Sequence, residues 1–280
     1  MRPAPVPAQQ RPLVMGVLNI TPDSFYDGGR HNTFESAVAR GVEMMAEGAD
    51  VVDVGGESSR PGADPVPLDV ELARVVPGVE ALSAEAARAV QPVRLSVDTV
   101  KPEVARAALA AGATLLNDIT ASLWEEAAAA GAGWVAMHMQ GTPRTMQEHP
   151  HYADVVAEVR GFVLARARTA FNAGVREVWV DPGIGFGKTI AHNLSLLRHL
   201  PELVEAATAA GCAGVLVGTS RKRFLGVLAA GGHPEPAPAE DREEGSLATA
   251  AAALVAGAGM VRVHDVAATV QVARLYGPAA

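Results

Sequence analysis

Short apolar runs rich in β-branched residues alternate along the chain with longer, alanine-rich stretches. This alternation is typical of parallel strands joined by crossover helices. Eight strand–helix units favour an α/β fold that closes on itself, the (β/α)8 or TIM barrel. The pattern predicts strands near residues 13–18, 50–55, 93–97, 113–116, 133–137, 177–180, 214–218 and 259–263.

A glycine separates a helix from the following strand in six of the seven connections of this scheme. Glycine suits the position because helices commonly end with a left-handed residue, a conformation that costs glycine nothing sterically. Pro92 occupies the remaining connection. The recurrence supports the count of units. The six glycines are Gly48, Gly112, Gly131, Gly174, Gly211 and Gly257.

The predicted strands finish in polar residues, which would therefore ring one mouth of the barrel. Ligands bind at that mouth in barrels of this kind, because the loops after the strands converge there. An open, doubly wound sheet remains the alternative, since it also alternates strand and helix and binds ligands at the strand ends. The polar residues are Asn19, Asp53, Asp98, Asn117, His138, Asp181, Ser220 and His264.

The length of the chain fits one domain. The chain has 280 residues, and one barrel of this type needs roughly 250. We therefore predict a single barrel domain over residues 12–277. The first eleven residues are rich in proline and lack the apolar stretch of a signal peptide. Residues 1–11 are predicted to form a disordered tail.

The composition limits the cellular location and the classes of binding partner that we expect. No apolar run approaches the roughly 20 residues that a membrane helix needs, and the net charge of -8 argues against nucleic-acid binding. The single cysteine, Cys212, cannot form an internal disulfide, which agrees with a cytoplasmic location. We expect a soluble cytoplasmic protein with small-molecule ligands and with no membrane or nucleic-acid partner.

Acidic and amide groups follow the middle strands. Asp98 ends the third strand and Asn117 the fourth, and together they suit a heterocycle with an N–C–N edge, because a carboxylate accepts two parallel hydrogen bonds. Asp98 could instead merely cap the next helix. Asp181 begins a glycine-rich segment that lacks the first glycine of a Walker motif, since position 182 is proline. There the glycines would let the backbone and Phe186 approach a ligand.

Cationic groups follow the last two strands, where barrels commonly bind phosphate. Alternation along a strand points Arg262 and His264 the same way, so both can reach one phosphate group. Arg60, in the loop after the second strand, offers another planar fork for an anion. The alternative is an ordinary charged surface.

Three further patterns carry no chemistry in our interpretation. The spacing of His138, His149 and His151 fits no usual zinc site. Ser220 does not stand in the G-x-S-x-G turn of a hydrolase nucleophile. Cys212 precedes an apolar strand far from the predicted mouth, and we interpret it as a small buried hydrophobic residue.

Eight segments together resemble dihydropteroate synthase, from about residue 13 to residue 272. The resemblance implies a transferase of folate biosynthesis that joins 6-hydroxymethyl-7,8-dihydropterin pyrophosphate to 4-aminobenzoate, giving 7,8-dihydropteroate and pyrophosphate. It also implies assistance by Mg2+ and a homodimer. The segments are NITPDSF, DVGGESSRPGA, SVDT, LLND, MHMQGTP, DPGIGFGK, SRKRF and RVHD.

The resemblance also implies roles for individual residues, four of which (Asp98, Asp181, Lys222 and Arg262) would be catalytic. The pterin would be bound by Asp98, Asn117, Asp181 and Lys222. The pyrophosphate would be bound by Asn19, Arg60, Arg262 and His264, with Asn19 also contacting the metal. The aminobenzoate pocket would be formed by Phe25, Ser59, Pro61, Phe186 and Ser220, where the family often has threonine at the position of Ser59.

Two other functions remain open at the level of sequence. One is the pterin-binding domain of corrinoid-dependent methyltransferases, a related barrel that needs no pyrophosphate site. The other is a barrel that binds a pterin without catalysing a reaction. The cationic SRKRF and RVHD segments favour the synthase.

Overall fold

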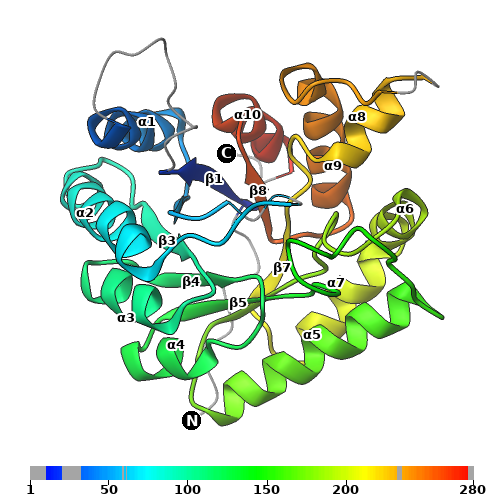
Figure 1. Ribbon diagram of the computed structural model, residues 1–280, viewed down its shortest axis with the longest axis horizontal. Helices are drawn as coiled ribbons and strands as arrows, with labels where there is room; N and C mark the ends of the chain where they lie inside the picture. The colour runs from blue at the N-terminus through cyan, green and yellow to red at the C-terminus, as the bar shows by residue number, and fades with distance from the viewer. Residues whose placement is uncertain (1–10, 21–32, 59, 61, 232–234, 277–280) are drawn as a thin grey trace.

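The computed structural model describes residues 11–20, 33–58, 60, 62–231 and 235–276. Within them, eight parallel strands close into a barrel in sequence order, and β1 pairs with both β2 and β8 (Figure 1). This closure confirms the predicted TIM barrel and excludes the open sheet. The strands are β1 (Leu13–Asn19), β2 (Val51–Gly55), β3 (Arg94–Asp98), β4 (Leu115–Asp118), β5 (Gly133–Met137), β6 (Val178–Asp181), β7 (Gly214–Val217) and β8 (Met260–Val263).

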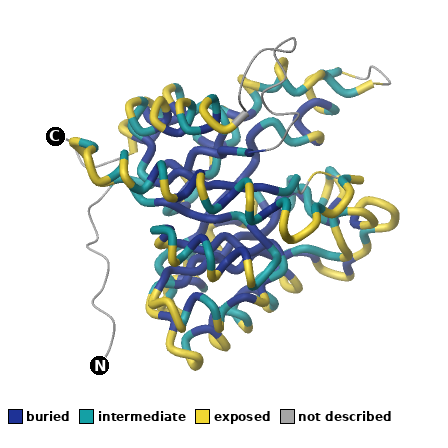
Figure 2. Tube along the Cα trace, turned by 60° about the vertical axis from the view of Figure 1, so that its left-hand side comes forward, coloured by how far each residue is buried: buried dark blue, intermediate teal, exposed yellow. Residues whose placement is uncertain are grey.

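The helices surround the barrel, and their inward faces are buried while their outward faces are exposed (Figure 2). The units after β6 and β7 each contain more than one helix. None of the described helices is long and apolar enough to cross a membrane. The helices are α1 (Thr33–Glu47), α2 (Leu68–Ala86), α3 (Pro102–Ala110), α4 (Trp124–Ala130), α5 (Val155–Asn172), α6 (Ile190–Arg198), α7 (Leu200–Ala209), α8 (Arg223–Ala229), the 3-10 helix η2 (Glu240–Arg242), α9 (Glu243–Val255) and α10 (Val266–Leu275).

Each predicted strand overlaps an observed one, and the largest difference is at β4. That strand was expected over residues 113–116 but covers Leu115–Asp118. Ala113 and Thr114 connect the turn at residues 111–112 to the strand: the Ala113 N–H donates back to the carbonyl of Ala108, and the Thr114 N–H donates to the carbonyl of Leu95 in β3. Asn117 and Asp118 are consequently the last two residues of the strand rather than part of the loop.

The interior of the barrel has an apolar floor. Side chains two positions further along a strand point to the same side, so the next layer toward the carboxyl ends is also internal. That next layer contains Asp53, Asn117, Asp181 and Arg262, which places charged groups directly above a dry surface. The floor consists of Met15, Val51, Leu115, Val135, Trp179, Leu216 and Met260.

A second charged group closes the amino-terminal end of the barrel. Arg94 donates two hydrogen bonds to Glu177, of 2.7 and 2.9 Å, and Glu177 also accepts the indole N–H of Trp179 at 2.8 Å. Burial raises the pKa of Glu177, but the hydrogen bonds from Arg94 and Trp179 outweigh it and lower the pKa below its usual value. This group lies at the end opposite the expected ligand site.

The six glycines predicted between helices and strands all adopt positive φ angles, from 66° at Gly131 to 120° at Gly112. The prediction of left-handed helix ends is therefore confirmed. Cys212, interpreted from sequence as a small buried hydrophobic residue, is only partly buried but packs against the core, and burial raises the pKa of its thiol to about 11.

Gly112→Ala should destabilise the fold more than Gly131→Ala. A β-carbon at Gly131 would contact nothing within 4 Å, so only the left-handed backbone opposes it, at a cost of about 1 kcal/mol. At Gly112 a β-carbon would lie 2.4 Å from the hydroxyl of Ser83, and overpacking should bring the total to roughly 2 to 4 kcal/mol. Urea unfolding of both variants measures the difference, and equal losses would contradict this account.

Candidate active site

Side chains from β2, β3, β4 and β8 meet above the apolar floor. Arg262 donates from Nε to Asp53 at 2.6 Å and from Nη2 to Asp98 at 2.7 Å. Asn117 donates its amide to the same oxygen of Asp53 at 2.9 Å. Acidic groups of β2 and β3 are thus in direct contact with the cationic Arg262 of the last strand.

Asp98 does not cap the following helix. The cap position of α3 is Lys101, with no side-chain hydrogen bond to the helix, whereas the carboxylate of Asp98 pairs with Arg262. Burial raises the pKa of Asp98 to about 7, and the negative charges of Asp53 and Glu71 add to the effect while Arg262 opposes it. Asp98 therefore lies in the candidate site as the partner of Arg262 and not as a helix cap.

Asp181, at the end of β6, and Lys222, in the turn after β7, are near enough for each charge to act on the other. Burial raises the pKa of Asp181, and Lys222 and the Gly183 N–H, which donates to it at 2.7 Å, oppose the rise. Burial lowers the pKa of Lys222 to about 8, although Asp181 favours its charge. The ammonium donates to the carbonyl of Ile184 and lies 4.7 Å from the ring centroid of Phe186. Phe186 thus joins the predicted site.

Lys188 is a buried residue of this region to which sequence reasoning gave no role. Its side chain is only 2% exposed, and its ammonium lies 2.9 Å from Nδ1 of His138 and 3.0 Å from the carbonyl of Phe186. Burial lowers the pKa of Lys188 to about 7, and burial together with Lys188 lowers that of His138 to about 3. The pair holds the Phe186 segment against the end of β5.

A signal for Lys188 was present in the composition. Only three of the 23 basic residues are lysines, Lys101, Lys188 and Lys222, and the structure places each in a polar contact at the carboxyl end of the barrel. Asp53 was also given no role, although it is fully buried between apolar neighbours in β2. Its second oxygen and the hydroxyl of Ser96 are buried without a hydrogen-bond partner in the described part of the chain.

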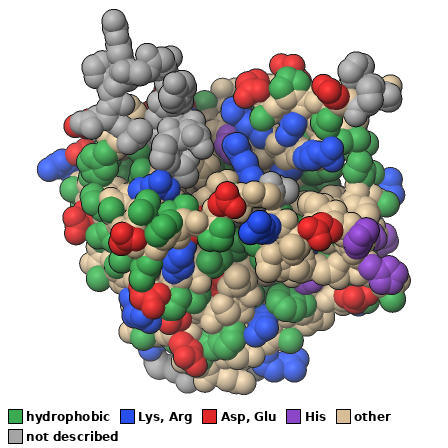
Figure 3. All heavy atoms as spheres, in the orientation of Figure 1, with side chains coloured by type: hydrophobic (Ala, Val, Ile, Leu, Met, Phe, Trp, Pro, Cys, Tyr) green, Lys and Arg blue, Asp and Glu red, His purple; other side chains and the backbone are tan. Residues whose placement is uncertain are grey.

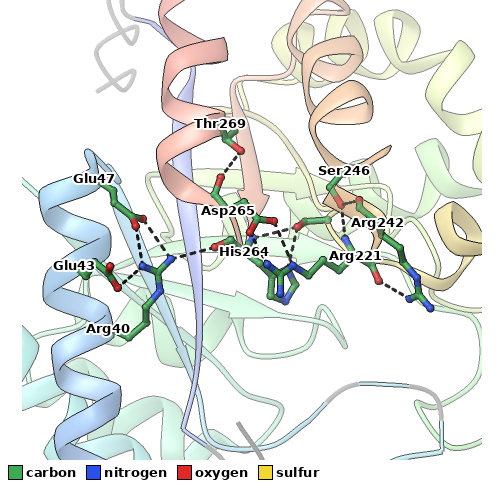
Figure 4. Close-up of polar contacts among 10 residues, drawn as sticks. Arg40, Glu43, Glu47, Arg221, Arg242, Ser246, His264, Asp265 and Thr269 are labelled. Atoms are coloured by element: carbon green, nitrogen blue, oxygen red, sulfur yellow. Dashed lines mark hydrogen bonds and ion pairs between the residues drawn. The ribbon is translucent and has the colours of Figure 1, made fainter. Parts of the chain in front are cut away.

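Ser220, predicted to line the aminobenzoate pocket, and His264, predicted to bind the pyrophosphate, form a second hydrogen-bonded group after β7 and β8 (Figure 4). The hydroxyl of Ser220 lies 3.0 Å from Nδ1 of His264 and accepts the backbone N–H of His264 at 3.2 Å. Arg40 of α1 donates to the carbonyl of His264 at 3.4 Å. Burial lowers the pKa of His264 to about 3, and Arg262, Arg221 and Arg60 contribute. His264 is therefore neutral and can act as a hydrogen-bond donor or acceptor.

Arg221 fixes the turn that carries Ser220 and Lys222. It has a φ of +57°, and the Lys222 N–H donates to the carbonyl of Thr219 at 3.1 Å, which is the arrangement of a type II turn. A residue other than glycine is strained there. Three contacts hold it: its N–H donates to Ser246 at 2.8 Å, its carbonyl accepts from Arg242 at 2.8 Å, and its guanidinium pairs with Asp265 at 2.5 Å.

The remaining predicted residues lie at the same mouth or outside the described residues. The amide oxygen of Asn19 is 3.5 Å from where a β-carbon on Gly55 would lie, at the ends of β1 and β2. Arg60 is exposed, and its charge acts on both His264 and Arg242. Several Lys and Arg side chains gather on the face shown in Figure 3, over β8 and α9. Phe25, Ser59 and Pro61 lie outside the described residues.

The donors available to a metal are few. Among the described residues, no group of three or more His, Cys, Asp or Glu side chains could hold a metal ion. Asn19 contributes one neutral oxygen at the mouth. Mg2+ is often bound through substrate phosphates and water with only one or two protein ligands. The residues present therefore fit a Mg2+ ion that is held mainly by a phosphorylated substrate.

Comparison with known proteins adds independent evidence. The chain matches the family described as pterin binding enzyme over residues 15–264. The dihydropteroate synthase of Mycobacterium leprae is 45% identical over 272 residues, which cover 94% of this chain and 92% of that protein.

Solved structures agree with this match. The dihydropteroate synthase of Xanthomonas albilineans with 4-aminobenzoic acid has a TM-score of 0.84 and 47% identity, and the alignment covers 95% of this chain and 92% of that one. The Xanthomonas albilineans enzyme in complex with 7,8-dihydropteroate has a TM-score of 0.80 and 43% identity, and the alignment covers 95% of this chain and 92% of that one. The chain, with its closed barrel and its charged site at the strand ends, belongs to the dihydropteroate synthases within the family of pterin-binding enzymes.

Proposed function

We propose that this chain condenses 6-hydroxymethyl-7,8-dihydropterin pyrophosphate with 4-aminobenzoate at the mouth of the barrel, releasing pyrophosphate and 7,8-dihydropteroate. The single observation that carries the proposal is the meeting of Asp98, Asp181, Lys222 and Arg262 in one buried group. A ligand with a hydrogen-bonding heterocycle at one end and an anion at the other can contact both signs of charge there. The complexes of the Xanthomonas albilineans relative with 4-aminobenzoic acid and 7,8-dihydropteroate support it.

The pterin would be held by Asp98, Asn117, Asp181 and Lys222. A carboxylate accepts two parallel N–H donors, which matches the N–C–N edge of a pterin. The side-chain amide N–H of Asn117 donates to Asp53. The side-chain carbonyl oxygen of Asn117 is left to accept a hydrogen bond from the ligand. Asp53 thereby orients Asn117 and also Arg262 through one oxygen.

The bond between carbon and the departing oxygen would break first, leaving a resonance-stabilised pterin cation that the arylamine then attacks. No side-chain nucleophile is required. Asp98 and Asp181 would stabilise the cation, while Arg60, Arg262 and Lys222 would stabilise the developing negative charge of pyrophosphate. His264, being neutral, would contribute a hydrogen bond to the pyrophosphate rather than a charge. The apolar floor beneath these groups keeps water away and strengthens each of the interactions.

Mg2+ would be the cofactor, with Asn19 as its protein ligand. When bound, the ion supplies positive charge to the leaving pyrophosphate. Asn19 offers only a neutral oxygen, so we expect little affinity for the ion in the absence of the pyrophosphate substrate.

The 4-aminobenzoate would lie beside Phe186 and Ser220, with Phe25, Ser59 and Pro61 completing its pocket. The ring of Phe186 is already positioned by Lys222 and, through its backbone, by Lys188. Ser220 shares a hydrogen bond with His264, so the pocket adjoins the pyrophosphate site. This adjacency suits a reaction in which the amine replaces the pyrophosphate.

We further propose a homodimer in the cytoplasm, with both substrates as its small-molecule partners. The resemblance to the synthases supports the homodimer. The single cysteine is consistent with a reducing compartment.

The proposed function is tested by incubating the purified protein with Mg2+, the dihydropterin pyrophosphate and 4-aminobenzoate. We expect 7,8-dihydropteroate and pyrophosphate in equal amounts by mass spectrometry, and loss of turnover when EDTA removes Mg2+. Binding of the pterin pyrophosphate without any product would instead support a non-catalytic barrel. Methyltetrahydrofolate binding without pyrophosphate release would support the methyltransferase domain.

Arg262→Ala should lower kcat on the order of 100-fold, because a preorganised electrostatic donor to the leaving group is lost. Steady-state kinetics measure the change, and circular dichroism checks that the variant is folded. Arg262→Lys keeps the charge but loses the fork that spans Asp53 and Asp98, so it should recover only part of the rate. Unchanged kinetics in Arg262→Ala would refute the assignment.

Pterin binding should weaken as the pH falls through about 7. Burial raises the pKa of Asp98 to about 7, so acidification protonates the carboxylate and removes an acceptor that the heterocycle needs. Below that pH we expect about a tenfold loss of affinity per pH unit, the limit for one titrating group. Isothermal titration with 6-hydroxymethylpterin, which has no titrating phosphate, measures it between pH 6 and 8.5. Asp98→Asn should bind weakly and lose the step near pH 7, leaving only the change that Lys222 causes near pH 8. Absence of the step near pH 7 in the unmodified protein would contradict the assignment.

A further inference from the structure

Four side chains form a polar cluster beside the site, and none of them has a role in the proposed reaction. They are Glu57, Glu71, Thr99 and Lys101, which we call the Lys101 clamp. The ammonium of Lys101 donates to one oxygen of Glu57 and to one oxygen of Glu71. Glu57 lies in the loop after β2, Glu71 in the first turn of α2, and Lys101 before α3. The cluster therefore joins two consecutive strand–helix units, β2–α2 and β3–α3.

The clamp is attached to the backbone that carries Asp98. Thr99 follows Asp98 directly, and its hydroxyl donates to the second oxygen of Glu71 at 2.7 Å. The same hydroxyl accepts the backbone N–H of Lys101 at 3.2 Å. The Thr99 N–H donates to the carbonyl of Asn117 at 3.3 Å. One end of the clamp is thus fixed to the strands that form the pterin side of the site.

The other end of the clamp fixes the loop that carries Arg60. The oxygen of Glu57 that accepts from Lys101 also accepts the backbone N–H of Val66 at 3.0 Å. Residues 57 and 66 are consequently held at one point, and Arg60 lies on the segment between them. Further along, the Gly62 N–H donates to the carbonyl of Pro143 at 3.2 Å. Among the described residues, Lys101 supplies the ion pairs that join Glu57 to Glu71 of α2, while Arg74 of α2 donates only to the backbone carbonyl of Gly56, at 2.9 Å.

Electrostatics make the ammonium difficult to replace. The side chain of Glu71 is 1% exposed and that of Glu57 22%, so two carboxylates converge in a largely buried place. Burial opposes the charge of Lys101, but its hydrogen bonds with Glu57 and Glu71 outweigh this and raise its pKa above the usual value. Removing the ammonium would leave a buried carboxylate unpaired next to a second one, which is unfavourable. Moving segment 57–66 away from Glu71 relieves that repulsion.

We propose that Lys101 is a positioning residue for the transfer reaction, which holds segment 57–66 against Glu71 and so places Arg60 at the pyrophosphate side of the site. The inference rests on the proposed function. A compact ammonium suits the task because its donors can serve two carboxylates at one point, whereas a guanidinium presents a wide planar fork. Lys101 itself contacts no substrate and acts through Arg60.

Lys101→Met tests the proposal, because it should weaken binding of the pyrophosphate half of the substrate and leave binding of the pterin half unchanged. We expect KM for the dihydropterin pyrophosphate to rise on the order of tenfold, because Arg60 is displaced. The Kd for 6-hydroxymethylpterin should change less than about twofold, because Asp98, Asn117 and Asp181 stay in place. A purely structural defect would weaken both ligands together, and that result would overturn the proposal.

A double-mutant cycle shows whether Lys101 acts through Arg60. If it does, Lys101→Met should add little to the effect of Arg60→Ala on KM, because residues that act as one unit are not additive. Fully additive effects would overturn the proposal. Arg94→Met is the matched control, since it breaks a partly buried ion pair, with Glu177, at the opposite end of the barrel. It should leave both KM and the pterin Kd within about twofold of the unmodified protein.

Hydrogen exchange gives a readout that does not depend on activity. Amides of residues 57–66 should exchange faster in Lys101→Met than in the unmodified protein, while those of β3 keep their protection. Unchanged exchange in this segment would overturn the proposed role of Lys101, even if the synthase assay succeeds. Absence of turnover in the unmodified protein would instead contradict the proposed function and would leave the exchange result standing. If Lys101→Met does not fold, Glu57→Met removes both acceptor oxygens, releases the loop and keeps the Lys101–Glu71 pair, with the same expectations.

Discussion

Arg262 donates to Asp53 and Asp98, and these two contacts govern how the whole mouth of the barrel is arranged. A guanidinium is a rigid fork, so it can hold carboxylates from two different strands at defined positions. Asp53 passes the constraint on to Asn117 through a shared oxygen. Because the layer beneath is apolar, each charge depends on its partners for solvation, and loss of one partner would cost about 3 to 5 kcal/mol at a buried pair.

Burial moves the pKa values of the acidic and the basic groups of the site toward neutral pH. It raises the pKa of Asp98 to about 7 and lowers the pKa values of Lys188 and Lys222 to about 7 and about 8. Their charges are therefore held weakly, and a ligand that brings its own donors and charges can change the protonation of the site at small cost. Such adjustable groups are common where a site must accept a charged substrate and release a charged product.

Local patterns in the sequence were sufficient for the fold and for much of the site. Glycines such as Gly112 and Gly131 marked the helix ends, and polar residues after apolar runs identified Asp98 and Asp181. The partners of these groups could not be deduced, because they come from units that are distant in sequence. Asp53, for example, is by sequence only a polar residue within an apolar strand, and its partner Arg262 lies in the last strand. Lys101 and Lys188 were missed for the same reason, since the carboxylates and the imidazole that they contact lie far away in sequence.

Arg221 illustrates a conflict between backbone and side chain at a single position. Its left-handed conformation would suit glycine, but glycine would abandon the ion pair to Asp265 that links the ends of β7 and β8. A cationic side chain such as lysine keeps the link to Asp265 and retains the strain, whereas glycine alone relieves the strain and loses the link. Sequence drift at position 221 is therefore blocked in both directions, so the turn can change only together with the side chains of Ser246, Arg242 and Asp265 that surround it.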